Sequence, residues 1–214
     1  MTIRHHLTDQ MLMAYSSGDL PEGFALVVAT HISMCDECRA RAETFDTLGG
    51  AVVEDMAVDM AEGSLAACMA RIETMPQANA HAPRRGHGIL PAPLVDYVGG
   101  GLDAVKWRPL GPGAKQAILR TSDTGVMVRL LSIPGGVAMP DHSHRGVELT
   151  LVLHGAFRDQ TDRFVVGDVE VADDSLEHTP VAEAGQTCIC LAATEGPLRF
   201  NTLLPRLAQS FFRI

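Results

Sequence analysis

Three residues in the N-terminal third have the types and the spacing of metal ligands. His31, Cys35 and Cys38 form the pattern H-x3-C-x2-C. We predict that all three lie on one helix, where offsets of four and seven residues rotate a side chain by only about 40° and 20°, so that they share a face. Structural zinc sites are closed tetrahedra of thiolate sulfur and imidazole nitrogen. The pattern therefore predicts three ligands of a structural zinc site.

A histidine ahead of the first predicted helix can supply the fourth ligand. His5 and His6 both stand at that point of the sequence, and we prefer His6. The resulting site would pin the first helix against the long one, which matters in a module too small for a large core. The alternative is a pair of buried free cysteines, because cysteine often packs as a small apolar residue. The polar residues around Cys35 and Cys38 favour zinc.

A second set of candidate ligands lies in the C-terminal half. The segment from Gly136 to Gly155 matches the pattern G-x5-H-x-H-x3-E-x6-G, which is the first sequence motif of cupins. Histidines two apart at the start of a strand point to the same face, and a glutamate that opens the next strand returns an oxygen to it. Together with one histidine further along the chain, the predicted ligands are His142, His144, Glu148 and His178.

The second cupin motif, G-x5-P-x-G-x2-H-x3-N, is only partly kept. Gly167 and His178 stand at its first glycine and its histidine, whereas Asp173, Ser175 and Ala182 replace the proline, the second glycine and the asparagine. These departures fall in turns and at an outer position, so we expect the ligand set to be complete. Mixed nitrogen and oxygen ligation suits zinc, iron, manganese or nickel. The alternative is a cupin that has lost its metal and uses its histidines for hydrogen bonds only.

Two further cysteines, Cys188 and Cys190, are two residues apart in a predicted strand. They would face the same side with Cα atoms about 6.5–7 Å apart, which is at or beyond the usual limit for a disulfide. If they face the inside of the domain near the metal, they form a candidate redox pair. The alternative, which we prefer, is that they are two small core residues.

The composition predicts a folded cytoplasmic protein without a membrane span. The chain has 214 residues, enough for one large domain or two small ones. It has five cysteines, no signal peptide and no apolar run of 18 residues, which argues against a disulfide framework and a transmembrane helix. The net charge is −9, and residues 1–75 hold twelve acidic residues against four arginines. Such a surface suits a basic protein partner rather than nucleic acid, unless it is simply a solvated helix face.

The hydrophobic pattern predicts a helical module over 1–75, an extended linker over 76–95 and an all-β domain over 96–214. The first helix is expected between Thr8 and Gly18, a long helix from Pro21 to about Gly49, and further helices over 51–61 and from Ser64. Six short apolar runs predict strands typical of a barrel or sandwich, at 116–119, 126–133, 149–153, 165–171, 187–192 and 200–204.

An N-terminal histidine followed by H-x3-C-x2-C in a helical module resembles the zinc-binding anti-σ domain. Because a single cupin domain follows, the chain resembles the ChrR family of anti-σ factors over nearly its whole length. The resemblance implies an all-α bundle with zinc joined to an all-β cupin barrel, the double-stranded β-helix. It also implies two zinc ions, held by His6, His31, Cys35 and Cys38 and by His142, His144, Glu148 and His178.

The same resemblance implies a negative regulator of transcription. Such a protein sequesters one extracytoplasmic-function (ECF, group IV) σ factor and releases it on an oxidative signal, such as singlet oxygen, sensed through the cupin domain. It implies no direct contact with nucleic acid or membrane. The alternative is a metal-dependent cupin enzyme, a dioxygenase or isomerase. The N-terminal module, which a metabolic cupin does not need, favours the regulator.

Overall fold

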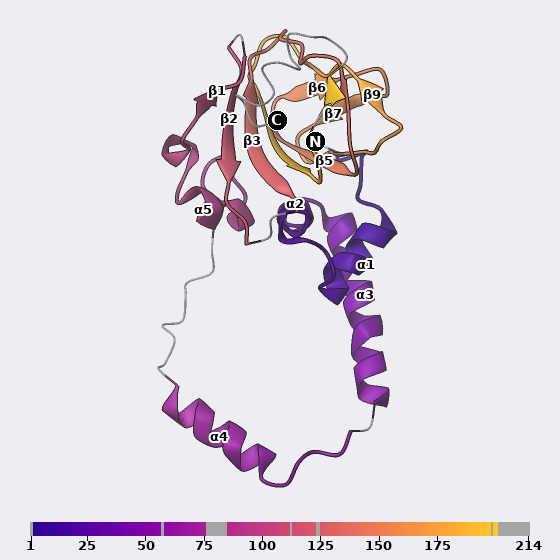
Figure 1. Ribbon diagram of the computed structural model, residues 1–214, viewed down its shortest axis with the longest axis vertical. Helices are drawn as coiled ribbons and strands as arrows, with labels where there is room; N and C mark the ends of the chain where they lie inside the picture. Colours follow the sequence, from indigo (N-terminus) through magenta and orange to yellow (C-terminus); the bar gives the residue numbers. More distant parts are fainter. Residues whose placement is uncertain are drawn as a thin grey trace.

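The computed structural model describes residues 2–56, 58–75, 85–111, 113–122, 125–197 and 199–200. Its N-terminal part is helical and its C-terminal part is a β-rich, cupin-like domain, as the sequence predicts. Figure 1 shows helix α2 against the cupin-like domain, α3 projecting away from it and α4 lying apart from both. No helix in the described part of the chain is both long enough and apolar enough to cross a lipid bilayer.

The first helix begins and ends at the residues that its capping signals predict. In α1 (Asp9–Ser17) the hydroxyl of Thr8 accepts the N–H of Met11 at 3.3 Å. Gly18 ends the helix in the left-handed conformation, with a φ of 78°. These local signals therefore start α1 shortly after the N-terminal segment that carries His5 and His6.

The helix predicted to carry His31, Cys35 and Cys38 is broken into two. α2 (Glu22–Ile32) ends after His31, and α3 (Asp36–Asp55) begins after Cys35. Cys35 has an extended backbone, and its Sγ accepts the N–H of Cys38 at 3.5 Å as a cap of α3. The prediction of one helix is therefore wrong, because a side chain that caps a helix start favours a turn at that point.

α3 continues through the paired glycines that predict its end. Gly49 and Gly50 lie inside the helix, where glycine costs about 0.5–1 kcal/mol relative to alanine without breaking the helix. The separate helix predicted over 51–61 is therefore wrong, since 51–55 belong to α3 and 58–61 are not helical. α4 (Ser64–Thr74) begins at Ser64, which the sequence predicts as its N-cap; the N-cap is instead Gly63.

The predicted linker contains regular structure in its second half. Residues 76–84 lie outside the described residues. His87 and Leu90 form an isolated antiparallel bridge, and α5 (Ala92–Val98) follows. An extended conformation is wrong for residues 92–95, because Leu94 is fully buried and anchors this short helix. The boundary between the two domains itself stays a prediction.

The cupin-like domain consists of three sheets. The largest has the strand order β1-β2-β3-β11-β5-β8 and the smaller ones the orders β10-β6-β7 and β12-β4-β9. No hydrogen-bonded ladder among the described residues closes these sheets into one barrel. In the large sheet the bounds are β1 (Arg108–Pro109), β2 (Lys115–Leu119), β3 (Met127–Ile133), β5 (Glu148–His154), β8 (Val169–Ala172) and β11 (Cys188–Thr194). In the small sheets they are β4 (His142–Ser143), β6 (Ala156–Arg158), β7 (Arg163–Val165), β9 (Glu177–His178), β10 (Val181–Ala182) and β12 (Arg199–Phe200); a single 3₁₀ turn, Leu102–Ala104, precedes β1.

Four of the six predicted strands correspond to β2, β3, β5 and β11. The run 165–171 is instead divided between β7 and β8, because Gly167, with a φ of 93°, turns the chain between them. The last predicted strand overlaps β12 at Phe200, and residues 201–204 lie outside the described residues.

The central strands are buried on both faces, and the two faces have different neighbours. In β5, Leu149, Leu151 and Leu153 belong to a core that includes residues of α2 and α5. Val152, on the opposite face, belongs to a second core that includes Cys188 and Cys190 of β11. Because side chains alternate along a strand, one face of the sheet packs on helices and the other lines the interior of the cupin-like domain.

The helical region and the cupin-like domain share one hydrophobic core. α2 contacts strands β5 and β11, and Gly23 lies against β3 so closely that a Cβ would sit 2.6 Å from Cγ1 of Val126 and 2.8 Å from Cγ2 of Val128. Hydrogen bonds to Glu22 from Tyr97 of α5 and from Ser122 flank this contact. A large apolar interface of this kind resists independent motion of its two sides.

Two candidate metal centres

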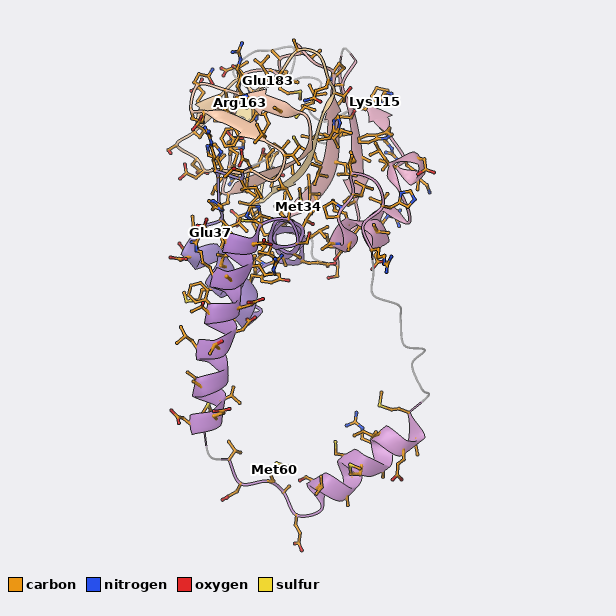
Figure 2. All side chains as sticks on the ribbon, turned by 180° about the vertical axis from the view of Figure 1, so that it is seen from behind. Met34, Glu37, Met60, Lys115, Arg163 and Glu183 are labelled. Atoms are coloured by element: carbon orange, nitrogen blue, oxygen red, sulfur yellow. The ribbon has the colours of Figure 1, made fainter. Side chains whose placement is uncertain are left out.

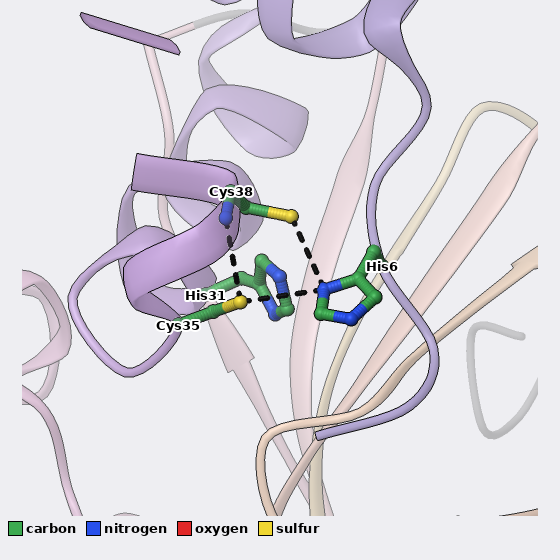
Figure 3. Close-up of side chains that lie close together, drawn as sticks. All are labelled: His6, His31, Cys35 and Cys38. Atoms are coloured by element: carbon green, nitrogen blue, oxygen red, sulfur yellow. Dashed lines mark hydrogen bonds between the residues drawn. The ribbon is translucent and has the colours of Figure 1, made fainter. Parts of the chain in front are cut away.

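The first candidate centre joins the N-terminal segment to the turn between α2 and α3. His6, His31, Cys35 and Cys38 offer four ligand atoms that lie within 4.8 Å of one another. His6 Nδ1 lies 3.3 Å from Cys35 Sγ and 3.5 Å from Cys38 Sγ (Figure 3). The structure thus brings together the four predicted residues, although they come from three different elements.

His5 and His6 point in different directions. His5 faces the cupin-like domain, where its Nε2 lies 3.1 Å from Asp162 Oδ2 and its Nδ1 lies 3.2 Å from Asp168 Oδ2. His6 faces the two thiols with Nδ1, and its Nε2 lies 3.5 Å from a carboxylate oxygen of Glu37. Of the two histidines, only His6 belongs to the group of candidate ligands.

His31 has the orientation of a metal ligand. Its Nδ1 lies 2.9 Å from the carbonyl oxygen of Gly167, which can only accept, so Nδ1 carries the proton. Nε2 is then a buried acceptor, and it has no hydrogen-bond partner among the described residues. Such an acceptor costs about 1–3 kcal/mol, a cost that a bound cation would remove. The donor set of two imidazoles and two thiols fits zinc.

The charges of this centre also fit a cation. Burial lowers the pKa of His31 to about 4, so the imidazole is neutral at physiological pH. Burial raises the pKa of Cys38 to about 11, and the neighbouring Cys35 adds to that rise. A divalent cation reverses this preference, because it binds thiolates and displaces their protons. The buried thiol pair is therefore suited to bind a cation as thiolates.

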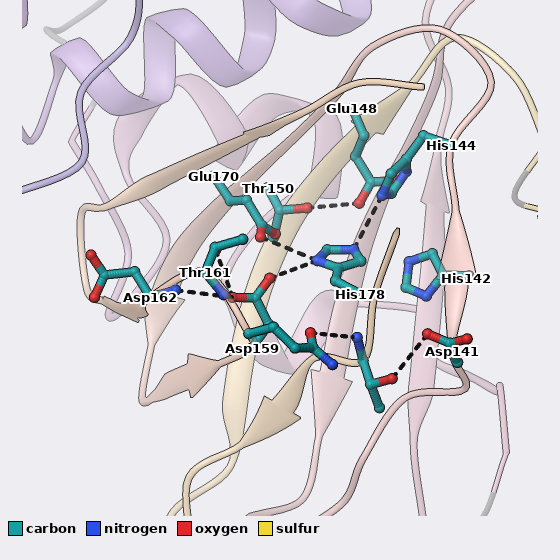
Figure 4. Close-up of polar contacts among 12 residues, drawn as sticks. Asp141, His142, His144, Glu148, Thr150, Asp159, Thr161, Asp162, Glu170 and His178 are labelled. Carbon is teal, nitrogen blue, oxygen red and sulfur yellow. Dashed lines mark hydrogen bonds and ion pairs between the residues drawn. The ribbon is translucent and has the colours of Figure 1, made fainter. Parts of the chain in front are cut away.

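The second candidate centre consists of three imidazoles in the cupin-like domain. His142 in β4, His144 directly after it and His178 in β9 offer ligand atoms within 4.8 Å of one another. Strands β4 and β9 pair with His142 opposite His178. His144 Nε2 lies 3.1 Å from His178 Nε2 (Figure 4), close to the spacing of about 3.3 Å between two nitrogen ligands of a tetrahedral zinc ion. We refer to these residues as the histidine triad.

Outer contacts fix which nitrogen of two triad members faces inward. His142 Nδ1 donates to the carbonyl of Pro140 at 2.8 Å, so its Nε2 carries the lone pair that could bind a metal. His178 Nδ1 lies 2.8 Å from Asp159 Oδ2 and 3.2 Å from Glu170 Oε1. Burial opposes protonation of His178, but Glu170 and Asp159 outweigh it and raise the pKa to about 9. A carboxylate behind a histidine makes it a more basic ligand.

Glu148, the fourth predicted ligand, lies beside the triad. Its Oε2 is 3.4 Å from His144 Nδ1, and its Oε1 accepts the hydroxyl of Thr150 at 3.0 Å. Burial opposes its ionisation, yet the imidazoles of His144 and His142 lower its pKa. Glu148 is therefore an anion at neutral pH. The carboxylate is not part of the group of three nitrogens. Its role as a ligand stays a prediction.

Two carboxylates at this centre were not predicted from the sequence. Asp159, between β6 and β7, and Glu170, in β8, form a further group of candidate ligand atoms with His178. Glu170 is 5 % exposed, and burial raises its pKa to about 7. The sequence signal for Glu170 is weak: it is one acidic residue between valines in a buried strand.

Cys188 and Cys190 are buried near each other on the inner face of β11. Their sulfur atoms lie 3.5 Å apart, and the pairing of β11 with β5 shifts register between Ile189 and Cys190. A bulge of this kind re-aims side chains within a strand. The hydrogen bond with Cys188 and then burial raise the pKa of Cys190 well above the usual value. Cys190 is therefore a protonated thiol in close contact with the sulfur of Cys188.

Several large apolar side chains between residues 48 and 75 lie outside the hydrophobic cores. Side chains from the second half of α3, the segment after it and α4 are exposed, and in α4 they recur at spacings of four and three residues, which puts them on one helix face. Figure 2 shows this segment, which includes Met60, well away from the cupin-like domain. We call it the α3–α4 apolar face; its members are Leu48, Val52, Val53, Met56, Val58, Met60, Leu65, Met69, Ile72 and Met75.

Comparisons with known proteins identify relatives along the whole chain. Residues 98–198 match the family model of the ChrR cupin-like domain. The chain is 60 % identical over 215 residues to the anti-sigma-E factor ChrR of Cereibacter sphaeroides, with 100 % of both chains covered. It is 58 % identical to a chain in the crystal structure of Rhodobacter sphaeroides SigE in complex with the anti-sigma ChrR, with a TM-score of 0.78, covering 90 % of this chain and 99 % of that one. An anti-sigma factor is a regulator rather than an enzyme.

Proposed function

Because the chain belongs to the ChrR family of anti-σ factors, we propose that it binds one ECF σ factor in the cytoplasm and keeps it from RNA polymerase. A relative at 58 % identity is in complex with SigE in its crystal structure. The observation that carries the proposal is the α3–α4 apolar face, since ten large apolar side chains exposed along one stretch of a soluble protein indicate an interaction site.

The charge around this face selects the kind of partner. Residues 1–75 contain twelve acidic residues and four arginines. A basic protein surface is attracted to this field, whereas the phosphates of nucleic acid are repelled. An apolar face in an acidic part of the chain therefore supports a protein with a basic and apolar surface as the partner. It does not support direct binding to DNA.

We propose zinc for both candidate centres. At the first centre, zinc would join His6, at the N-terminal segment, to His31 at the end of α2 and to the two cysteines at the start of α3. The ion would hold α3 at a fixed angle to α2 and so present the apolar face in one geometry. At the second centre the histidine triad and Glu148 would hold the other ion. Zinc there would stabilise the arrangement of its ligands rather than catalyse a reaction.

We further propose that an oxidative signal such as singlet oxygen acts at the interior of the cupin-like domain. Cys188 and Cys190 are the candidate targets, because their sulfurs need to close only from 3.5 Å to about 2.05 Å to form a bond. In that step both S–H bonds break and one S–S bond forms. Two protons and two electrons pass to singlet oxygen, which becomes hydrogen peroxide. The bond would strain β11, which packs on α2.

Transcription reconstituted from purified components tests the σ proposal. RNA polymerase, a purified ECF σ factor from the same organism and this chain are combined, and transcripts from a σ-dependent promoter are measured. Zinc-loaded protein should abolish the transcript at about one chain per σ. Full transcription at excess protein, with no complex detected by size-exclusion chromatography, would contradict the proposal.

The oxidative proposal has its own test in the same system. Singlet oxygen generated by a photosensitiser should restore transcription with the wild-type chain but not with a Cys188→Ser, Cys190→Ser variant that still binds σ. Loss of two thiols per chain, counted by alkylation and mass spectrometry, should accompany release. Equal release from the variant would show that these cysteines are not the target.

A further inference from the structure

One turn of the cupin-like domain contacts both His31 and the peptide that leads into His6, the two histidines of the first candidate centre. This turn, residues 166–168, connects β7 to β8. The turn is distant from the centre in sequence. Its hydrogen bonds to the N-terminal segment and to α2 join residues more than 130 positions apart. No metal-binding motif of the helical region includes it.

The contact with His31 fixes the ring that offers Nε2 to the centre. The carbonyl of Gly167 accepts the Nδ1–H of His31 at 2.9 Å. Gly167 has a φ of 93°, and a Cβ at this position would sit 2.6 Å from Cδ1 of Ile3. The backbone of the turn is therefore pressed between the N-terminal segment and α2, and glycine makes that approach possible.

The contact with the N-terminal segment fixes the residue before His6. Asp168 is 0 % exposed, and its Oδ1 accepts the N–H of Arg4 at 2.7 Å and the N–H of His5 at 3.1 Å. Its Oδ2 accepts the N–H of Val165 at 2.9 Å, which ties the carboxylate to its own turn. On the other side of His5, the N–H of Val169 donates to the carbonyl of His5 at 3.2 Å. The peptide that leads into His6 is thus held by the cupin-like domain at several points.

We propose that Gly167 and Asp168 are positioning residues of the N-terminal metal centre, supplied by the other domain. The cupin-like domain orients the two imidazole ligands, whereas the cap of α3 orients the two thiolates. The inference rests on the proposed zinc at this centre. Removing an outer partner of a metal ligand costs about 10- to 100-fold in affinity, so metal retention at the centre should depend on the 166–168 turn.

The same strand also reaches the histidine triad. Glu170 follows Asp168 by two residues, and its Oε1 lies 3.2 Å from His178 Nδ1. This gives the two sites a short covalent connection through one strand, in addition to the apolar contact of α2 with the sheet.

Asp168→Asn is the sharpest test in the full-length chain. An amide keeps one acceptor, so it cannot accept from Val165 on one side and from Arg4 and His5 on the other. Zinc release to a chromophoric chelator should be faster by about tenfold or more for one of the two ions. When cobalt replaces zinc, the thiolate-to-cobalt charge-transfer band of Asp168→Asn should be shifted from that of wild type. The reason is that the two imidazole ligands of the same ion lose their fixed orientation.

Asp162→Asn is the matched control. Asp162 also touches the ring of His5, at 3.1 Å, but it is exposed and accepts none of the backbone N–H groups that lead to His6. It should release zinc at the wild-type rate. Misfolding is recognised separately, because an unfolded Asp168→Asn chain loses both ions, whereas the predicted effect leaves the triad's ion in place.

Equal zinc release from Asp168→Asn, Asp162→Asn and wild-type protein would overturn the inference. If the wild-type chain binds zinc and σ but all three proteins behave alike, only the role of the 166–168 turn is wrong. If wild-type protein retains no metal at the cysteine-containing centre, the proposed function is wrong as well.

Discussion

Replacing Gly23 by alanine should weaken the interface between the helical region and the cupin-like domain. The added Cβ would lie 2.6 Å from Val126 and 2.8 Å from Val128, both closer than van der Waals contact allows. Both residues are β-branched, so their side chains have few alternative rotamers with which to avoid the added Cβ. Overpacking costs about 1–3 kcal/mol, whereas alanine in a helix gains about 0.5–1 kcal/mol over glycine. The net loss in the free energy of unfolding should be about 1–2 kcal/mol.

Thermal unfolding of zinc-loaded protein measures this loss. At about 2–4 °C per kcal/mol for a chain of this size, Gly23→Ala should lower Tm by about 2–8 °C. Gly49→Ala is the matched control, since it lies in α3 with nothing within 4 Å of its added Cβ. The control should not lower Tm. A Tm for Gly23→Ala equal to or above that of Gly49→Ala would refute the close packing of α2 on β3.

Further predictions concern the metal centres and the acid limit of stability. Cys35→Ser with Cys38→Ser should remove one metal ion per chain and abolish σ binding, as measured by elemental analysis and pull-down. A σ complex that still forms would contradict the proposal that the zinc ion fixes α3 for σ binding. His142→Ala with His144→Ala should also remove one ion but leave σ binding intact, so loss of the complex would show that the triad supports the interface directly. Burial of Asp168 opposes its ionisation, but hydrogen bonds from backbone N–H groups outweigh it and lower its pKa. Its contribution to stability is therefore present above the unfolded-state pKa of about 3.9 and is lost as pH falls through the depressed folded-state pKa. Denaturant unfolding measured at decreasing pH should show that the free energy of unfolding falls less steeply with pH for Asp168→Asn than for wild type. The same pH dependence for both proteins would count against a stabilising role of the Asp168 carboxylate.

The ligand residues were predictable because their spacing is a local property of the chain. His31, Cys35 and Cys38 converge although the helix between them is broken, because a turn with Cys35 as cap also brings the three together. The same motif left His5 and His6 unresolved, since neighbouring residues in an extended segment differ only in which way they face. Their assignment depends on Asp168, which lies more than 160 residues away.

The rest of the candidate sites depended on long-range packing. Asp159 and Glu170 belong to no motif, and only the fold places them behind His178. The continuous apolar character of β5 and β11 predicts strands buried on both faces, but not that one face is covered by α2. The paired glycines predict a helix end, with a separate helix after it, whereas the α3 backbone continues through Gly49 and Gly50 to Asp55.

Binding of σ by the α3–α4 apolar face is the claim on which the account depends. Met69 and Ile72 of α4 are 49 % and 58 % exposed, so replacing both by aspartate should change the chain's own stability little. At the centre of an interface each such change costs about 2 kcal/mol or more, or roughly 30-fold in affinity. Ala67→Asp with Ala70→Asp adds the same charge to the opposite, exposed side of α4.

The dissociation constant of the zinc-loaded chain for an ECF σ factor, measured by calorimetry for these two double variants and the wild type, is the most direct test. The account predicts that Met69→Asp with Ile72→Asp weakens binding by at least about 30-fold, while Ala67→Asp with Ala70→Asp binds nearly as tightly as wild type. Equal affinity of all three proteins for σ would contradict it.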